Sequence, residues 1–405
     1  MHRSAVVELL VDAGRAVVTK KNSKICVVTG SRADYGLLKS PMARIRECEG
    51  LTLQLVVTGS HHSKTYGESR DIILADGFCI GADVPLSDRV VSPLDMAQDA
   101  GVALQGMAQA LSRLQPDLVL LLGDRYEIFA TATAACLLNI PLAHLCGGDL
   151  TTGAIDDALR HGISKMAHLH FPSNEDAARR LKQMGEADER VFTIGSPGLD
   201  AIREMTFAGR AAVFNELGLP QSDRLYLVSL HPETLSVRPV ADQVESLCQA
   251  LSSLDPDIAL VLSGSNADAG GVEISERLEA FAQTRSRAVF RRNLGHDLYL
   301  NVMRQAAMVI GNSSSGLYEA PSFKAPTVNV GRRQDGRLKA ASVIDCHGDD
   351  ESIGRALDKA SALDCRDVIN PYGDGRAAEK LVDVLTGITD YRALLDKPFV
   401  DREFV

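Results

Sequence analysis

A run of small polar residues, Gly311–Gly316 (Gly-Asn-Ser-Ser-Ser-Gly), follows an apolar segment that ends at Ile310. Such a loop can present backbone N–H groups and hydroxyls to an anion, and the N-terminus of a following helix adds its positive dipole end. Glu319, about one turn further along, can accept hydrogen bonds from ribose hydroxyls. The alternative is an ordinary strand-to-helix turn with a serine N-cap. The run by itself leaves both interpretations open.

Basic residues follow this loop closely. Arg332, Arg333 and Arg337 come directly after an apolar segment, and guanidinium groups so spaced can neutralise a diphosphate. His231, after another apolar segment, can bind a diphosphate or donate a proton to a leaving group. The alternatives are a solvated basic turn and a histidine that caps a helix. The serine run upstream favours the diphosphate site.

Carboxylates gather in the first half of the chain. Asp124 follows the apolar run 117–122, and a carboxylate there is costly unless it is paired or functional. Asp149 and Asp156 flank a second polar stretch, beside Cys146 and two glycines that permit close backbone approach. The alternative for Asp124 is a helix cap. These groups are candidates for acid–base chemistry.

Two further polar loops complete the candidate set. Arg32 lies in Gly30–Gly36, which lacks the G-x-G-x-x-G spacing of a dinucleotide site, and Asn266 lies in Gly264–Gly270. His168 and His170 alternate as on a strand, but no third ligand stands at metal spacing. We therefore expect no cofactor and no metal, and a structural role for these two histidines.

Short apolar segments alternate with segments of helical period. The expected strands are 24–29, 52–58, 117–122, 141–145, 191–194, 225–230, 258–262, 288–290, 308–310 and 327–330. The expected helices are 35–48, 94–114, 125–139, 155–167, 174–185, 240–254, 273–284, 296–306, 316–324 and 376–387. Continuously apolar strands joined by helices indicate parallel sheets covered on both faces.

The chain is too long for a single hydrophobic core, at 405 residues. A segment around 196–223, with several glycines and prolines, separates two series of strands and helices. These features predict an α/β protein with two Rossmann-like doubly wound domains that face a cleft, with ligands beyond the carboxyl ends of the strands. The predicted division is an N-terminal domain, a C-terminal domain, a C-terminal helix with its tail, and an extension of unknown role: 24–205, 206–380, 381–405 and 1–23.

Composition narrows the functional class. The net charge of −10 disfavours a nucleic acid or an acidic membrane surface as partner. No apolar run is long enough to span a membrane, and Glu8 and Asp12 interrupt the apolar N-terminal stretch, which therefore does not read as a signal peptide. The eight cysteines are scattered, and several, such as Cys26 and Cys136, lie in apolar runs, which predicts buried free thiols. A cytoplasmic protein is expected.

Taken together and in order, these loops resemble the hydrolysing UDP-N-acetylglucosamine 2-epimerases of bacterial sialic-acid biosynthesis. The matching segments are Gly30–Gly36, Gly123–Glu127, Gly147–His161, His231–Thr234, Ser265–Gly270, Gly311–Gly316 and Gly331–Arg337. The resemblance implies two Rossmann-like domains of the glycosyltransferase-B type. It also implies anti-elimination of UDP to a 2-acetamidoglucal, followed by hydration with inversion at C2 that releases N-acetylmannosamine. No nicotinamide is required, because the intermediate is an alkene.

The resemblance also assigns residues. Asp124 and Asp156 match catalytic carboxylates, and His231 matches a histidine near the diphosphate. The matched positions that contact the UDP-sugar substrate are Arg32, Asn266, Ser313, Ser314, Glu319 and Arg333. Members of the family form dimers or tetramers, so a homo-oligomer is expected.

Two positions depart from the family pattern. Cys146 stands where some members carry a glutamate thought to act as a base and others a histidine, and a thiol is a poor proton acceptor at neutral pH. We therefore expect Cys146 to line the catalytic site. Asp149 stands where many relatives carry glutamate. The substrate thus has an alternative, a 2,4-diacetamido sugar nucleotide of the legionaminic-acid type, and a glycosyltransferase-B sugar transferase is the alternative reaction.

Overall fold

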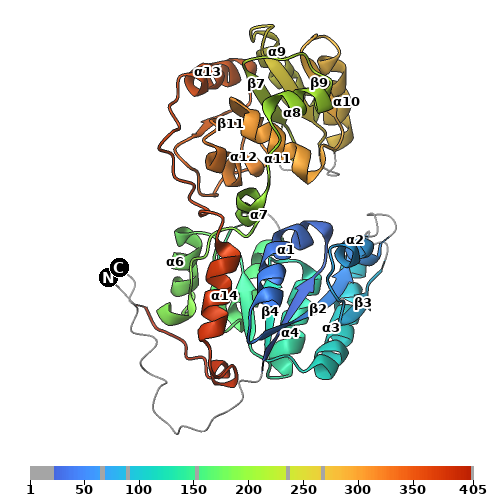
Figure 1. The fold of residues 1–405 in the computed structure, drawn as a ribbon, viewed down its shortest axis with the longest axis vertical. Helices are drawn as coiled ribbons and strands as arrows, with labels where there is room; N and C mark the ends of the chain where they lie inside the picture. Colours follow the sequence, from blue (N-terminus) through green and yellow to red (C-terminus); the bar gives the residue numbers. More distant parts are fainter. Residues whose placement is uncertain are drawn as a thin grey trace. The chain divides into compact units, whose positions relative to one another are not determined.

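The computed structural model describes residues 22–63, 69–87, 92–150, 155–233, 238–265 and 270–402. The chain forms two compact units (Figure 1). One unit, called unit 1 below, runs to Ala201 and resumes at Tyr372, and the other, unit 2, is Ile202–Pro371.

Within the described residues, unit 1 contains a six-stranded parallel sheet of order β3-β2-β1-β4-β5-β6. Its strands are β1 (Ser23–Thr29), β2 (Leu51–Gly59), β3 (Ala82–Pro85), β4 (Leu118–Leu122), β5 (Leu142–Leu145) and β6 (Leu169–Phe171). Its helices are α1 (Arg32–Glu47), α2 (Arg70–Ala75), α3 (Pro93–Leu114), α4 (Tyr126–Leu137), α5 (Ile155–Met166), α6 (Glu175–Gln183) and α14 (Ala377–Gly387), and α7 (Gly198–Glu204) crosses into unit 2. Side chains of α1 and α14 pack on one face of the sheet, and those of α3, α4 and α5 pack on the other.

Unit 2 repeats this plan, with the described strands in the order β12-β11-β10-β7-β8-β9 and all pairs parallel. The strands are β7 (Leu225–Ser229), β8 (Ala259–Ser263), β9 (Ala288–Arg291), β10 (Met308–Gly311), β11 (Thr327–Val330) and β12 (Val343–Cys346). The helices are α8 (Arg210–Leu217), α9 (Val240–Ser252), α10 (Gly271–Ala282), α11 (Gly295–Gln305), α12 (Ser315–Tyr318) and α13 (Asp350–Ser361). Helices α9, α10 and α13 cover one face, and α8 and α11 cover the other.

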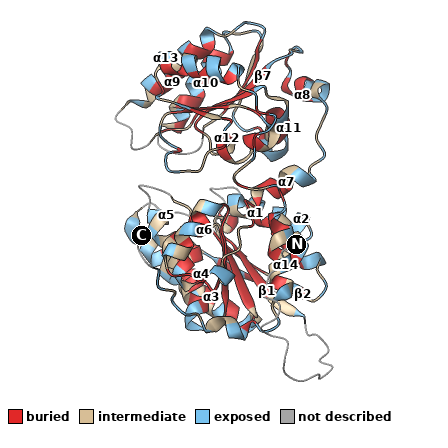
Figure 2. Ribbon diagram, turned by 90° about the vertical axis from the view of Figure 1, so that its left-hand side faces the viewer, coloured by how far each residue is buried: buried red, intermediate tan, exposed pale blue. Residues whose placement is uncertain are grey.

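Burial follows this layering. Figure 2 shows buried residues along the strands and exposed residues on the outer faces of the helices. Runs such as Leu118–Leu122 are buried throughout, as expected for parallel strands covered on both faces. The prediction of two Rossmann-like doubly wound domains is confirmed.

Helix α14 belongs to unit 1, which differs from the predicted division that ended the second domain at residue 380. Leu381 and Leu385 pack in the same core as Leu38 of α1. The N-terminus of α14 is capped by Asp200, whose two carboxylate oxygens accept hydrogen bonds from Ala377 and Ala378 N–H at 2.8 and 2.6 Å. These contacts explain why the chain returns to unit 1 after the second sheet.

Three other details differ from expectation. Residues 191–194 do not form a strand, because only Val191 bridges to His170 and the sheet ends at β6. Strands β3 and β12 were not expected, since their four-residue runs are too short to stand out. All eight cysteines are free, and Cys26 is buried, but Cys136 is exposed at the outer face of α4.

No helix of the described segments combines the length and apolarity needed to cross a membrane.

Candidate active site

The candidate residues of unit 1 lie where strands end. Arg32 opens α1 after β1 and is exposed, Asp124 follows β4, and Cys146 and Asp149 follow β5. Carboxyl ends of neighbouring parallel strands meet at one edge of a sheet, where doubly wound folds bind ligands. Asp156, in the first turn of α5, is half-buried.

Asp124 is held by an ion pair with the Arg160 guanidinium. Burial raises the pKa of the Asp124 carboxyl, the charge of Arg160 opposes this change, and the negative charge of Asp156 raises the pKa further. Asp156 is therefore close enough to influence the ionisation of Asp124. Two carboxylates in unequal environments are suited to separate acid and base roles.

Arg160 has further hydrogen-bond donors besides the one that binds Asp124. Its Nη2 binds Asp124, whereas its buried Nε and Nη1 have no hydrogen-bond partner among the residues that the structure describes. Buried donors normally have partners, so these atoms are available to a ligand oxygen.

Cys146 is a poor candidate for a base. Burial raises the pKa of its thiol, and the charge of Asp149 raises it further. The thiolate is thus disfavoured at neutral pH. Asp149 itself accepts hydrogen bonds from Ser173 Oγ at 3.0 Å and from Asn174 Nδ2 at 3.0 Å, and Asn174 caps α6. These contacts hold the loop after β5 against α6.

An ion pair between a partly exposed arginine and a buried glutamate supports the loop after β1. Arg125 Nε donates to the buried carboxylate of Glu127. A Cβ atom at Gly30 would lie 2.6 Å from Glu127 Oε1, so this turn requires glycine. Asp34 lies in the same electrostatic environment, and burial raises its pKa to about 6.

Unit 2 contains a pocket of about 290 Å³ at the carboxyl ends of its strands. Its lining includes His231, Arg292, Asn293, Tyr299, Ser313 and Ser315. The Tyr299 hydroxyl lies 2.5 Å from Ser315 Oγ, which donates to Ser313 Oγ at 2.9 Å. Burial raises the pKa of Tyr299, so its hydroxyl stays protonated and can fix the orientation of the serine hydroxyls.

The loop after β10 and the loop after β7 are joined by Asn312. Its Oδ1 accepts from His231 N–H at 2.7 Å, and its Nδ2 donates to the His231 carbonyl at 2.8 Å. The His231 ring lies beside Ser265, with 3.3 Å between Nδ1 and Oγ. Gly311 permits the close approach of the loop after β10 to the end of β7, because a Cβ atom at this position would lie 1.9 Å from the Ser229 carbonyl oxygen. Ser314 begins α12.

Glu319 ends α12 with one carboxylate oxygen, Oε2, buried and without a hydrogen-bond partner among the described residues. Burial raises its pKa to about 7. Arg333, after β11, donates from Nη1 to the Asn312 carbonyl at 3.3 Å. Asn266 lies outside the described residues, so its predicted contact stays a prediction.

A model of the UDP-N-acetylglucosamine 2-epimerase family matches residues 43–386 of the chain. The chain belongs to this family. The resemblance inferred from the motifs is confirmed, and the protein is an epimerase by family.

Two relatives of this epimerase are named for another sugar. The GDP/UDP-N,N'-diacetylbacillosamine 2-epimerase (hydrolyzing) of Campylobacter jejuni is 39% identical over 83% of this chain and 87% of its own length. The UDP-N,N'-diacetylbacillosamine 2-epimerase (hydrolyzing) of Legionella pneumophila is 34% identical over 92% and 98%. The crystal structure of UDP-GlcNAc 2-epimerase from Neisseria meningitidis bound to UDP-GlcNAc is similar in fold, with a TM-score of 0.71 and 16% identity over 90% of this chain and 99% of the other.

Arg160 lies in the matched segment Gly147–His161, but the sequence alone did not single it out as a site residue. Its position four residues after Asp156 places both on one side of α5, which is the available signal. Only the fold brings Arg160 to Asp124, which lies 36 residues earlier. Among the described residues, no group of histidine, cysteine and carboxylate side chains is arranged to hold a metal ion.

Proposed function

We propose that this epimerase is a hydrolysing 2-epimerase of a UDP-linked 2-acetamido sugar, which releases UDP and the free C2 epimer. The observation that supports this proposal best is the pair of carboxylates in unit 1, Asp124 and Asp156, with Arg160 bound to the first. Removal of an unactivated C2 proton requires a positioned base, and delivery of a new proton to the opposite face requires an acid.

In the first step Asp156 acts as the base. The C2–H bond and the bond from C1 to the diphosphate oxygen break, and the C1–C2 double bond forms. In the second step Asp124 donates a proton to C2 on the opposite face, water adds its oxygen to C1, and one proton of the water passes to the Asp124 carboxylate. Asp156 releases the proton that it took from C2 to the solvent. Burial raises the pKa of Asp124, which favours its role as the proton donor. Arg160 keeps Asp124 in place and offers the N–H groups of Nε and Nη1, which have no partner among the described residues, to the substrate.

The unit 2 residues would bind the leaving group. The hydroxyls and N–H groups of Ser313 and Ser314, with the guanidinium of Arg333, stabilise negative charge on the diphosphate. His231 supplies a proton or a hydrogen bond to the leaving oxygen, and Glu319 accepts hydrogen bonds from the ribose hydroxyls. Arg32 and Asn266 are assigned to the nucleotide by resemblance alone, and Asp149 to the sugar side.

The preferred sugar is a separate question. The motifs alone favour UDP-N-acetylglucosamine, whereas two relatives with 39% and 34% identity are named for N,N'-diacetylbacillosamine. We therefore propose the UDP-linked 2,4-diacetamido sugar as the better substrate and UDP-N-acetylglucosamine as the weaker one. A cytoplasmic homo-oligomer remains the expected form of the enzyme.

The reaction is tested in deuterium oxide, with each sugar nucleotide supplied alone and no acceptor present. Proton NMR of the product should show a free C2-epimeric sugar with deuterium at C2, and UDP should appear in equal amount. A C2 proton retained from the substrate, or turnover only with an added acceptor, would contradict the proposal. Comparison of kcat/KM for the two nucleotides decides the substrate, and a higher value for UDP-N-acetylglucosamine would reverse our assignment.

A further inference from the structure

His144 is a buried histidine of unit 1 that takes no part in the proposed reaction steps. It lies on β5 with no exposed surface. Its Nε2 is 2.7 Å from the Gly123 carbonyl oxygen, and its Nδ1 is 3.0 Å from Ser164 Oγ. A carbonyl oxygen can only accept a hydrogen bond, so Nε2 carries the hydrogen.

The ring is neutral. Burial lowers the pKa of His144 to about 3, against the opposing effect of the Gly123 carbonyl, and the neighbouring charges of His170, Arg160 and His161 also disfavour protonation. With the hydrogen on Nε2, Nδ1 of a neutral imidazole is an acceptor, and the Ser164 hydroxyl donates to it. Both partners are therefore satisfied by one tautomer.

These two bonds join the parts of the site. Gly123 immediately precedes Asp124, and Ser164 lies on α5, which also carries Asp156 and Arg160. His144 thus connects the loop that holds one carboxylate to the helix that holds the other.

The packing around His144 leaves no room for adjustment. A Cβ atom at Gly147 would lie 2.7 Å from Ser164 Oγ and 2.8 Å from His144 Nδ1, both closer than real contacts allow. The loop after β5 therefore closes directly over the histidine and serine pair.

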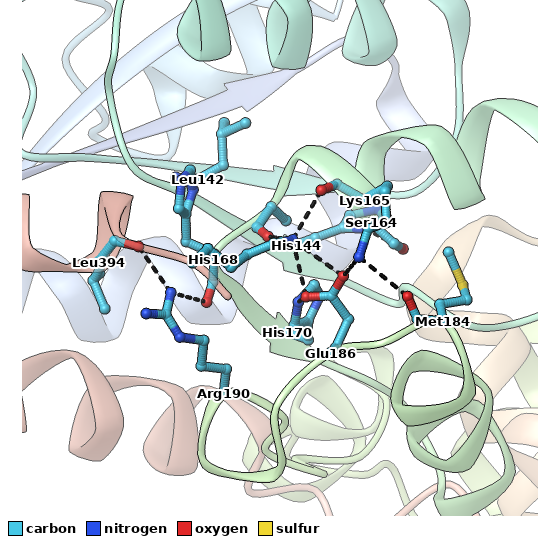
Figure 3. A network of polar contacts seen from close by, with 12 residues as sticks. Leu142, His144, Ser164, Lys165, His168, His170, Met184, Glu186, Arg190 and Leu394 are labelled. Carbon is cyan, nitrogen blue, oxygen red and sulfur yellow. Dashed lines mark hydrogen bonds and ion pairs between the residues drawn. The ribbon is translucent and has the colours of Figure 1, made fainter. Parts of the chain in front are cut away.

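A buried charged network lies alongside. His170, the neighbour of His144 across the β5–β6 ladder, binds Glu186 at 2.8 Å, and Lys165 binds the same carboxylate (Figure 3). Lys397 also pairs with Glu186, at 2.9 Å. Burial alone would raise the pKa of Glu186, but the hydrogen bonds from these partners lower it to about 2. Glu186 therefore stays charged, and the network fixes β6 and the end of α5.

We infer that His144 is a positioning residue for the epimerase reaction: it sets the distance between Asp124 and Asp156 by joining Gly123 to Ser164. This inference rests on the proposed function of the two carboxylates. It does not make His144 a catalytic residue, because both ring nitrogens are engaged within the protein.

The test compares two amides of different reach. In His144→Gln the amide nitrogen reaches the place of Nε2 and can donate to Gly123, and the amide oxygen, spaced from it much as Nδ1 is from Nε2, can accept from Ser164. In His144→Asn the amide reaches only the place of Nδ1, so the Gly123 contact is lost. We expect His144→Gln to keep kcat within about threefold of wild type. We expect His144→Asn to lower kcat by about 30-fold or more with KM little changed, since a misplacement of about 1 Å can cost two orders of magnitude. Ser164→Ala leaves the Gly123 contact intact but breaks the other bond of the join, so it should lower kcat as His144→Asn does, with KM little changed.

Hydrogen exchange measured by mass spectrometry gives a readout that does not depend on turnover. In His144→Asn, peptides that cover 118–127 and 155–166 should exchange faster, while peptides of unit 2 are unchanged and UDP affinity is retained. In His144→Gln the same two peptides should exchange as in wild type.

Equal loss of kcat in the Gln and Asn variants, or unchanged exchange of both peptides in the Asn variant, would overturn the inference. If the wild-type enzyme epimerises no sugar nucleotide, the proposed function fails, but the exchange experiment still decides whether His144 joins the loop to the helix.

Discussion

Glu319 allows a quantitative prediction, because its carboxylate oxygen Oε2 is buried and has no hydrogen-bond partner within the described segments. Its pKa is raised by burial from an ordinary value of 4.5 to about 7. The folded protein therefore keeps this proton in a pH range where the unfolded chain has lost it. Since the folded state binds more protons there, its stability must fall as the pH rises from about 4.5 to about 7.

The size of the effect follows from the two pKa values. The difference corresponds to about 3 kcal/mol of unfolding free energy. The protein has lost all of this stability above about pH 7 and has lost none of it below about pH 4.5. In a domain of the size of unit 2 this is about 6–12 °C in Tm. Replacement of Glu319 by Gln keeps the shape of the side chain and removes the titration.

The assay is calorimetric unfolding of wild type and Glu319→Gln between about pH 5 and about pH 8. The Tm of wild type should fall relative to that of the variant by several degrees across this range. UDP should reverse part of this loss in wild type, because ribose hydroxyls that donate to Glu319 favour the ionised form, so UDP affinity should rise with pH. Parallel Tm curves for the two proteins would refute the assignment of a raised pKa, and a UDP affinity with the same pH dependence in both would refute the ribose contact.

Three further predictions concern unit 1. Asp156→Asn should lower kcat by about 10²-fold to 10⁴-fold while UDP affinity, measured by calorimetry, changes by less than about twofold; an equal loss of both would assign Asp156 a structural role. Cys146→Ala should keep kcat within about threefold of wild type, because burial disfavours the thiolate. Loss of turnover in this variant would instead indicate that the thiol acts as the base. Gly147→Ala should lower both Tm and kcat, since the new Cβ atom meets Ser164 and His144, and an unchanged Tm would show that this contact relaxes freely.

The fold could be predicted because the strands of parallel sheets are continuously apolar segments of the sequence. Apolar runs such as 118–122 are buried on both faces, and they alternate with helices of clear period. The polar loops after these runs could be predicted as well, because the carboxyl ends of the strands are the edge where such folds bind ligands. The family followed from seven loops in order.

The remaining features depend on contacts between distant segments. Nothing near Arg160 in the sequence indicates its pairing with Asp124, and nothing near His144 indicates that Gly123 and Ser164 are its partners. The return of α14 to unit 1 has the same origin, since the Asp200 that caps it lies 177 residues earlier than Ala377. Strands β3 and β12 were not predicted, because an edge strand of four residues is too short to show a clear hydrophobic pattern in the sequence.

Deuterium incorporation at C2 tests the central claim most directly. The elimination and hydration mechanism requires that the C2 proton is lost to a carboxylate and replaced from solvent, and that UDP is released with the sugar. Proton NMR in deuterium oxide should therefore show a free sugar of inverted C2 configuration with deuterium at that carbon. Release of a sugar that retains its C2 proton would contradict the account.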